Sequence, residues 1–416
     1  MIFVPGQAGT TAMSNPKTMY YASVGPLLNM FDVDVDGAQL RERGAVTLPA
    51  NIQYAWPHPS RRYLYVVSSD GGPDVPGAKH FANAFAIDPA TGDLRAHGEP
   101  AALPSRPIHA SLDRGGSYLL TAYNDPSRLT VHRIVSDGVI GEPVIQDPDL
   151  DTGIYAHQIL ATPSNRCVVL VTRGNNSTAN KPEDPGAIKT FALDNGKLRN
   201  LASIAPGKGL GFGPRHLDFH PTKPWVFVSI ERQNKLYVYE LDEAAGLSRE
   251  PIFIKETLSN PKTAASQGAG AIHVHANGKF VYLTNRTFPA REGGREASQG
   301  GEDNLAVYAL DQNSGEPKPI QHIDGCGVQL RTFGIDASGR LLVATSIMPM
   351  LRSDGMTLPA GMTVFRIGAD GTLALARKYD VAVGNSQQFW SGMIPLPRPG
   401  EPRQQRLPRI NANLLF

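Results

Sequence analysis

Seven short runs along the chain are apolar at successive positions, not only at alternate ones. A strand with this pattern is buried on both faces, so each run predicts a β-strand that lies between two layers of sheet. The runs are YYASV (20–24), YLYVV (63–67), SYLLTAY (117–123), CVVLVT (167–172), WVFVSI (225–230), FVYLT (280–284) and LLVATSI (341–347).

A second segment follows each run and is rich in residues that favour strands, often with a final Asp. Its copies are NMFDVD (29–34), NAFAID (83–88), TVHRIV (130–135), KTFALD (189–194), YVYELD (237–242), AVYALD (306–311) and TVFRIG (363–368). Most of them lead into a glycine and an apolar residue, as in TGDL (91–94) and DGTL (370–373), which predicts a hairpin turn and a further strand.

A shorter strand precedes six of the seven runs. These strands are QYAWPHP (53–59), IHASLDR (108–114), HQILATP (157–163), RHLDFHP (215–221), GAIHVHA (270–276) and RTFGIDA (331–337). The missing copy occurs at the far end of the chain, as FWSGMIP (389–395). We therefore predict an all-β fold: a seven-bladed β-propeller of four-stranded blades, closed by a C-terminal strand that completes the N-terminal blade.

The ring is predicted to span 19–396, between a flexible N-terminal segment at 1–18 and a Pro/Arg-rich tail at 397–416. The alternative is a set of hairpins from two unrelated β-sandwiches. Seven matched copies and the displaced terminal strand argue against that alternative.

Composition narrows the classes of function. A net charge of +2 gives no strong field toward nucleic acid or a membrane surface. The two cysteines, Cys167 and Cys326, provide no disulfide framework, and the N-terminus has no pattern of a signal peptide, so a cytoplasmic protein is expected. No apolar stretch reaches the ~18 residues of a membrane span, and a monomer is the simplest expectation for a closed ring.

Charged residues fall at one end of the predicted inner strands. Antiparallel pairing brings the first residue of each inner strand and the residue sixteen positions later to the same rim. The pairs are Gln53 and Ser69, Ile108 and Asn124, His157 and Arg173, Arg215 and Glu231, Gly270 and Arg286, and Arg331 and Ile347. A sheet does not need charges at these places, so they predict a ligand site at the mouth of the ring.

Four long connections, 69–80, 173–187, 286–303 and 347–361, leave from the same rim. Long loops around one mouth predict a wall or lid, although each loop taken alone could be a tolerated surface insertion.

Four stretches carry a family resemblance: GPRHLDFHP, SIERQNKLYVYELD, AIHVHANGKFVYLTNR and RTFGIDASGRLLVATS. They resemble the seven-bladed propeller lactonases, a family that includes bacterial propeller-type 6-phosphogluconolactonase and the fungal 3-carboxy-cis,cis-muconate lactonizing enzyme. The resemblance implies that Arg215 is the active-site arginine, Glu231 its acidic partner, and Arg286 and His157 further site residues. The bacterial pattern has His-x-His where this chain has Tyr155-Ala156-His157, so one histidine is replaced.

Lactone hydrolysis requires a polarised carbonyl, a stabilised oxyanion and a group that takes a proton from water. Guanidiniums suit the first two tasks and also grip phosphate or carboxylate groups. We expect Glu231, His157 and Arg215 to be catalytic, with Glu231 slightly favoured over His157 as the proton acceptor. The expected substrate-binding residues are Arg286, Arg173, Arg331, Asn285 and Asn124. The substrate is then a small anionic lactone, with neither a metal nor an organic cofactor, and no nucleic acid or membrane partner.

Three alternatives remain at this stage. The enzyme could be a lactonizing cycloisomerase of the muconate type, or the ring could be a binding platform without catalysis. Arg215 and Glu231 could form only a structural ion pair. His216, His220, His273 and His275 alternate within inner strands and are expected to form hydrogen bonds between blades, not a metal site.

Overall fold

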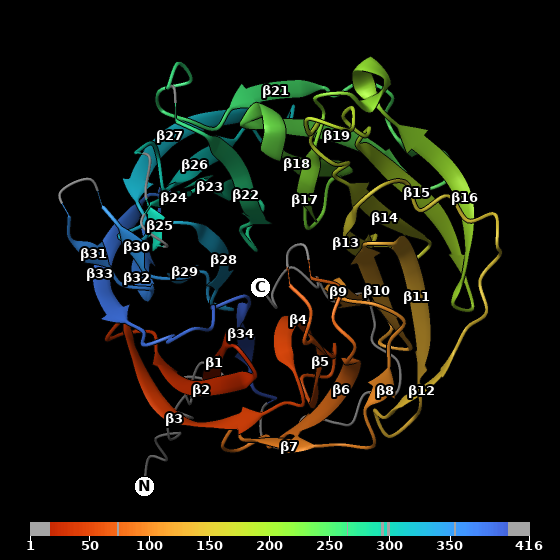
Figure 1. Ribbon diagram of the computed structural model, residues 1–416, viewed down its shortest axis with the longest axis horizontal. Coiled ribbons are helices and arrows are strands. Elements are labelled where there is room, and N and C mark those ends of the chain that lie inside the picture. The colour runs from red at the N-terminus through yellow and green to blue at the C-terminus, as the bar shows by residue number, and fades with distance from the viewer. Residues whose placement is uncertain are drawn as a thin grey trace, which may run out of the picture.

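The computed structural model of the protein describes residues 17–72, 75–263, 265–292, 295–297, 300–352 and 355–397. Most of the predicted terminal segments, 1–18 and 397–416, lies outside this range. Seven antiparallel sheets are arranged in a ring around a central axis (Figure 1), which confirms the predicted seven-bladed β-propeller.

The first four blades, each given from its innermost strand outward, use strands from both ends of the chain. Blade 1 contains β34 (Ser391–Pro395), β1 (Thr18–Val24), β2 (Leu27–Asp34) and β3 (Gln39–Thr47). Blade 2 contains β4 (Asn51–Pro57), β5 (Tyr63–Ser69), β6 (His80–Ile87), β7 (Leu94–Ala96) and β8 (Ala101–Ala102). Blade 3 contains β9 (Pro107–Leu112), β10 (Tyr118–Asn124), β11 (Ser127–Ile134) and β12 (Ile140–Pro143). Blade 4 contains β13 (Ala156–Ala161), β14 (Cys167–Thr172), β15 (Ala187–Asp194) and β16 (Lys197–Ile204).

The remaining three blades follow the same order. Blade 5 contains β17 (Pro214–Phe219), β18 (Trp225–Ile230), β19 (Lys235–Asp242), β20 (Gly246–Leu247) and β21 (Phe253–Glu256). Blade 6 contains β22 (Gln267–Val274), β23 (Phe280–Thr287), β26 (Asn304–Leu310) and β27 (Pro317–Asp324). Blade 7 contains β28 (Leu330–Ile335), β29 (Leu341–Ser346), β32 (Gly361–Ile367) and β33 (Leu373–Asp380). Two 3₁₀ turns, η1 (Pro206–Gly209) and η2 (Glu231–Gln233), lie in connections.

Ring closure occurs as the sequence predicts. Strand β34 pairs with β1 in antiparallel register, with Tyr20 opposite Met393 and Thr18 opposite Pro395. The first and last blade elements of the chain therefore share one sheet, and neither is left as an open edge.

The hydrophobic core is divided into seven clusters, and each cluster lies between two neighbouring blades. Residues from the doubly apolar runs supply both sides: Val226 and Val228 pack toward blade 4, while Phe227 packs toward blade 6. This arrangement explains why the central strands lack a polar face.

Histidines at the ends of inner strands join adjacent blades. The Nε2 atoms of His58, His220 and His275 lie 3.1, 2.9 and 3.0 Å from the carbonyl oxygens of Gly116, Gly278 and Gly339 in the next blade. Backbone N–H groups donate to Nδ1 of each ring, so Nε2 carries the proton and donates. The expected hydrogen bonds of His220 and His275 between blades are confirmed.

Two of the long connections form a small sheet that sequence analysis did not predict. The connection of blade 6 contributes β24 (Ala290–Glu292) and β25 (Arg295–Ala297), and that of blade 7 contributes β30 (Met350–Leu351) and β31 (Thr357–Leu358). Ala297 pairs with Leu351 in parallel, so loops from two blades are joined. Within the described part of the chain, no helix has the length and apolar character needed to cross a membrane.

Candidate active site at the axis of the ring

A β-bulge recurs at the beginning of five inner strands. One residue there is skipped in the pairing with the second strand of the blade, which interrupts the alternation of side chains and redirects the skipped residue. The skipped residues are Gln53, Ile108, His157, Arg215 and Arg331. Three of the predicted site residues therefore occupy equivalent bulge positions in blades 4, 5 and 7.

Glu231 is the centre of the site, and its side chain is shared by three arginines. Arg173 Nε and Arg286 Nη2 each donate a hydrogen bond to it, one to each carboxylate oxygen. Arg215 Nε lies 3.3 Å from Glu231 Oε1, as a close ion pair whose geometry does not meet that of a hydrogen bond. Glu231 and Arg215 are 2% and 1% exposed. The predicted neighbourhood of Arg215, Glu231, Arg173 and Arg286 is thus present in the structure.

The charges of these groups control the protonation of Glu231. Burial by itself would raise the pKa of the carboxyl, but the guanidiniums of Arg286, Arg173 and Arg215 outweigh burial and hold the pKa well below its usual range. Glu231 is therefore an anion across the working pH range. With both oxygens engaged by guanidiniums, it has little affinity for a further proton.

The partners of Glu231 shift in opposite directions. The hydrogen bond and charge of Glu231 overcome the effect of burial on Arg173, and the pKa of Arg173 is raised. The pKa of Arg215 is lowered, first by complete burial and then by the charge of Arg286. The difference follows from position, because Arg173 lies at the rim whereas Arg215 is enclosed among other cations. Guanidiniums remain charged even with such shifts.

Two more arginines extend the positive charge beyond Glu231. Burial and the charges of Arg286 and Arg106 lower the pKa of Arg331 to about 9. Arg331 lies over the ring of Phe389, with its guanidinium carbon 4.0 Å from the centroid. In the described part of the chain, neither Arg331 nor Arg106 has a carboxylate within ion-pair distance. Five guanidiniums therefore share one carboxylate.

His157 lies in the same cluster. Its ring stacks on Tyr155 with a centroid distance of 6.2 Å and packs edge-on against His216 at 5.2 Å. Burial, then the charge of Arg215, holds the pKa of His157 well below that of an ordinary histidine. Its imidazole is neutral, and its buried Nδ1 has no hydrogen-bond partner in the described structure. These properties favour His157 over Glu231 as the group that can take a proton.

Tyr155 is a site residue that sequence analysis did not select. Its backbone φ of 61° lies in the left-handed region, which is unfavourable for a tyrosine and is commonly found at functional sites. Arg173 lies over its ring, 5.5 Å from the centroid. Its charge influence reaches Arg106 and Arg331. The sequence signal was the replacement of a family histidine at this position.

Three buried histidines predict a loss of stability in acid. Burial and the charge of Arg215 lower the pKa of His109, His157 and His216 well below 6.5. Below about pH 6.5 the unfolded chain binds protons that the folded chain does not, so the free energy of unfolding falls by up to ~1.4 kcal/mol per pH unit for each histidine. Denaturant titrations between pH 7.5 and 5 measure this slope.

The variant His109→Gln is expected to reduce that slope by about one proton, whereas His97→Gln, at the outer edge of blade 2, leaves it unchanged. A free energy of unfolding that is constant from pH 7.5 to 5 would contradict the buried neutral histidines.

Two glycines allow the charged residues to approach one another. Gly213 has a φ of 54° and accepts a hydrogen bond from the Glu231 backbone N–H at 2.9 Å, which fixes the start of η2. A Cβ atom at Gly268 would lie 2.8 Å from Glu231 Cγ, so the site has room for no larger residue there.

The two predicted asparagines have different surroundings. Asn285 is buried, and its amide donates to the carbonyl oxygen of Thr257 at 2.6 Å and to Asn304 Oδ1 at 2.8 Å, so these hydrogen bonds join parts of blade 6. Asn124 is half-buried at the end of β10. The arginine contacts that surround Glu231 include neither residue.

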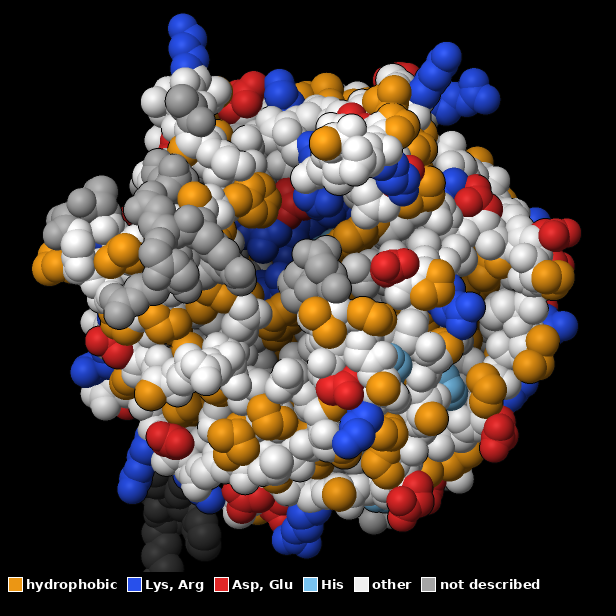
Figure 2. All heavy atoms as spheres, in the orientation of Figure 1, with side chains coloured by type: hydrophobic (Ala, Val, Ile, Leu, Met, Phe, Trp, Pro, Cys, Tyr) orange, Lys and Arg blue, Asp and Glu red, His pale blue; other side chains and the backbone are white. Residues whose placement is uncertain are grey.

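The surface above the cluster is hollowed. Figure 2 shows blue side chains of Lys or Arg and red side chains of Asp or Glu inside a recess near the centre of this face. The loop between β14 and β15 is fastened to the rim, because Glu183 accepts hydrogen bonds from Arg232 Nη1 and from the backbone of Gly211. Within the described residues, no group of three His, Cys, Asp or Glu side chains is placed to hold a metal ion.

The fold and the site together define a propeller with a positively charged binding site on its axis. The family model of the seven-bladed β-propeller lactonases matches residues 18–347, and the chain belongs to this family. The protein is accordingly a lactonase.

Relatives agree with this assignment. The chain is 27% identical over 326 residues to the 6-phosphogluconolactonase of Bacillus subtilis, covering 76% of this chain and 83% of the relative. It is 28% identical over 319 residues to the 6-phosphogluconolactonase of Pectobacterium carotovorum, covering 74% and 82%. The structure of the periplasmic gluconolactonase of Pseudomonas aeruginosa superimposes with a TM-score of 0.70 at 18% identity, over 92% of this chain and all of that one, which supports the fold.

Proposed function

We propose that this lactonase opens a sugar lactone that bears a phosphate or another anionic group, such as 6-phosphogluconolactone, by attack of water at the axial site. The observation that carries the proposal is the group of five guanidiniums around a single carboxylate. Such an excess of buried positive charge favours an anionic ligand. The names of the relatives point to the same substrate.

The arginines stabilise the charge that develops during the reaction. Attack of water on the lactone carbonyl converts its oxygen into an oxyanion. Arg215 Nε and Arg286 Nε are buried donors without hydrogen-bond partners in the described structure. Donors held in place in this way can bind the oxyanion without further reorganisation.

His157 would transfer the proton. The neutral imidazole accepts a proton from the attacking water, and the new C–O bond forms at the carbonyl carbon. When the tetrahedral intermediate collapses, the ring C–O bond breaks and the leaving oxygen receives the proton from His157. The products are a carboxylate and a hydroxyl group on the same sugar chain. Glu231 would serve to hold the three arginines in position.

A panel of lactones tests this function. The parent protein, treated with a chelator, is expected to open 6-phosphoglucono-δ-lactone with a kcat/KM at least tenfold above that for glucono-δ-lactone, since loss of one charge-assisted contact costs about this much. Both rates are measured by pH-stat against the spontaneous rate. A muconolactone is included to reveal a lactonizing activity. Opening of none of the lactones above the spontaneous rate would refute the proposal.

A further inference from the structure

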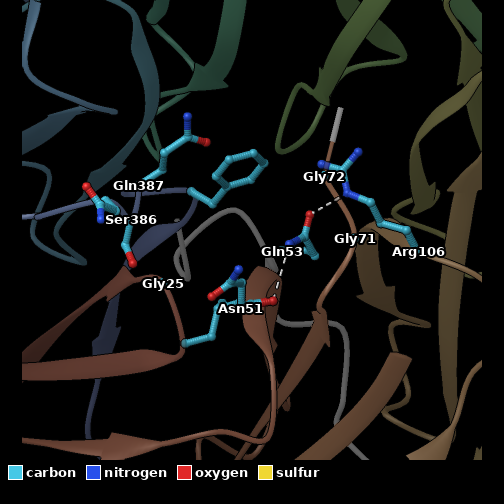
Figure 3. A pocket seen from close by; sticks show the side chains of 11 residues that line it. Gly25, Asn51, Gln53, Gly71, Gly72, Arg106, Ser386 and Gln387 are labelled. Atoms are coloured by element: carbon cyan, nitrogen blue, oxygen red, sulfur yellow. Dashed lines mark hydrogen bonds between the residues drawn. The ribbon is translucent and has the colours of Figure 1, made fainter. Parts of the chain in front are cut away.

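A cavity lies beside the axial site, between blades 1, 2 and 7 (Figure 3). Its volume is about 140 Å³. Amide side chains dominate its wall: Asn51, Gln53, Asn385 and Gln387. Since a water molecule occupies ~30 Å³ of liquid, the cavity has room for roughly five water-sized groups, which is the number of heavy atoms in a phosphate. The cavity is displaced from Glu231 toward the side of the ring where Arg106 and Arg331 lie.

Arg106 forms one wall of this cavity and is held by a chain of hydrogen bonds. Its Nε donates to Gln53 Oε1 at 2.9 Å, and Gln53 Nε2 donates to the backbone oxygen of Asn51 at 3.2 Å. Figure 3 shows this chain from Arg106 through Gln53 to Asn51. Arg106 is only 6% exposed, yet the described structure supplies no carboxylate for it. A buried cation held by amides is unfavourable without a counter-ion, so the position favours an anionic ligand.

Phe389 connects the cavity to the charged site. Its side chain lines the cavity, and the guanidinium carbons of Arg331 and Arg106 lie over its ring at 4.0 and 5.8 Å from the centroid. The aromatic ring fixes both cations by cation–π contact and leaves their edges free for hydrogen bonds. Arg331 is also close enough to Arg286 for their charges to interact. Positive charge is therefore continuous from the arginines that bind Glu231 to the cavity.

We propose that Arg106 and Arg331, supported by Phe389 and the amides of the cavity, form a second anion site that binds the remote charged group of the substrate, a phosphate monoester or a second carboxylate. The arginines around Glu231 then engage the lactone carbonyl at the other end of the molecule. This inference rests on the proposed function for the identity of the reacting group, but the anion site itself is defined by its own residues.

The variant Arg106→Gln separates the two parts of the substrate. We expect the KM for 6-phosphoglucono-δ-lactone to rise about 10- to 100-fold, with kcat changed less than about threefold, because a charge-assisted contact made equally in ground and transition states is lost. The ratio of kcat/KM between 6-phosphoglucono-δ-lactone and glucono-δ-lactone falls by the same factor. Glucaro-1,4-lactone, which carries a second carboxylate in place of phosphate, identifies which anion the site takes.

Two further variants control for structural damage. Arg106→Lys keeps a positive charge and is expected to recover part of the lost KM. Arg95→Gln, on the outside of blade 2 with a side chain 79% exposed, is expected to change neither lactone. If Arg106→Gln shifts the KM of charged and uncharged lactones equally, or shifts neither, the second anion site is refuted.

Calorimetry with 6-phosphogluconate and gluconate tests the anion site independently of catalysis. The parent protein should bind 6-phosphogluconate at least tenfold more tightly than gluconate, and Arg106→Gln should remove that preference. This result would support the anion site even if the parent opened no lactone. Equal preference in the parent and in Arg106→Gln would refute it.

Discussion

The variant Glu231→Gln is expected to lower kcat for lactone opening by about 10²- to 10³-fold. Gln is similar in shape but neutral, and it cannot accept from both Arg173 and Arg286 with an oxygen on each side. The guanidiniums would then separate from one another, and the donors for the oxyanion would lose their positions. Steady-state kinetics at pH 7 with 6-phosphoglucono-δ-lactone measure this loss.

The same substitution should reduce stability. Removing the charge leaves three neighbouring buried guanidiniums without compensation, and the free energy of unfolding is expected to fall by about 3–5 kcal/mol. The matched control is Glu183→Gln, because Glu183 also pairs with an arginine, Arg232, but its side chain is 29% exposed. The control should keep full activity and lose about 1 kcal/mol or less. Full activity of Glu231→Gln would exclude the proposed role of the carboxylate.

The variant Arg215→Met should have a comparable effect on activity and a different effect on stability. Arg215 supplies a buried donor at the bulge position of β17, and removing one such donor is expected to lower kcat by about 10²- to 10³-fold. Glu231 keeps its hydrogen bonds to Arg173 and Arg286, and one repulsive charge disappears from the cluster. We therefore expect the free energy of unfolding to remain unchanged or to rise by about 1 kcal/mol. Kinetics and denaturant unfolding of the same preparation measure both quantities.

Arg114→Met is the matched control for Arg215→Met. Arg114 is also a buried arginine, but it follows the opposite end of the inner strand that begins beside Arg106. Its Nε donates to the carbonyl oxygens of Ala161 and Thr162 at 3.1 and 3.3 Å, so its loss should reduce stability but leave kcat unchanged. If Arg215→Met were active but as destabilised as Arg114→Met, Arg215 would be a structural residue.

The sequence predicted the ring because its repeats are strongly patterned. The doubly apolar runs identified the central strands, and FWSGMIP at the C-terminus identified the closing strand. Spacing alone placed Arg215 near Glu231, since antiparallel strands of known length must bring their ends together. The added neighbours Arg173, Arg286 and His157 followed from the same geometry.

Other parts of the site could not be obtained in this way. The bulges that redirect His157 and Arg331 depend on the pairing of particular backbone groups and have no pattern in the side chains. Arg106 precedes its strand and bonds to Gln53 in another blade, a contact between residues far apart in sequence. The sheet of β24, β25, β30 and β31 joins two loops whose short strands show no alternation. Phe389, assigned to the closing strand, lies just before β34 and acts instead as a platform for Arg106 and Arg331.

A crystal structure of the protein with 6-phosphogluconate tests the central claim most directly, namely that the axis of the ring binds an anionic lactone through its arginines. We predict that the carboxylate of this product lies within hydrogen-bonding distance of Arg215 or Arg286, and its phosphate beside Arg106 and Arg331. A ligand bound at the outer surface of the blades, with the axial arginines making no contact to it, would contradict the account.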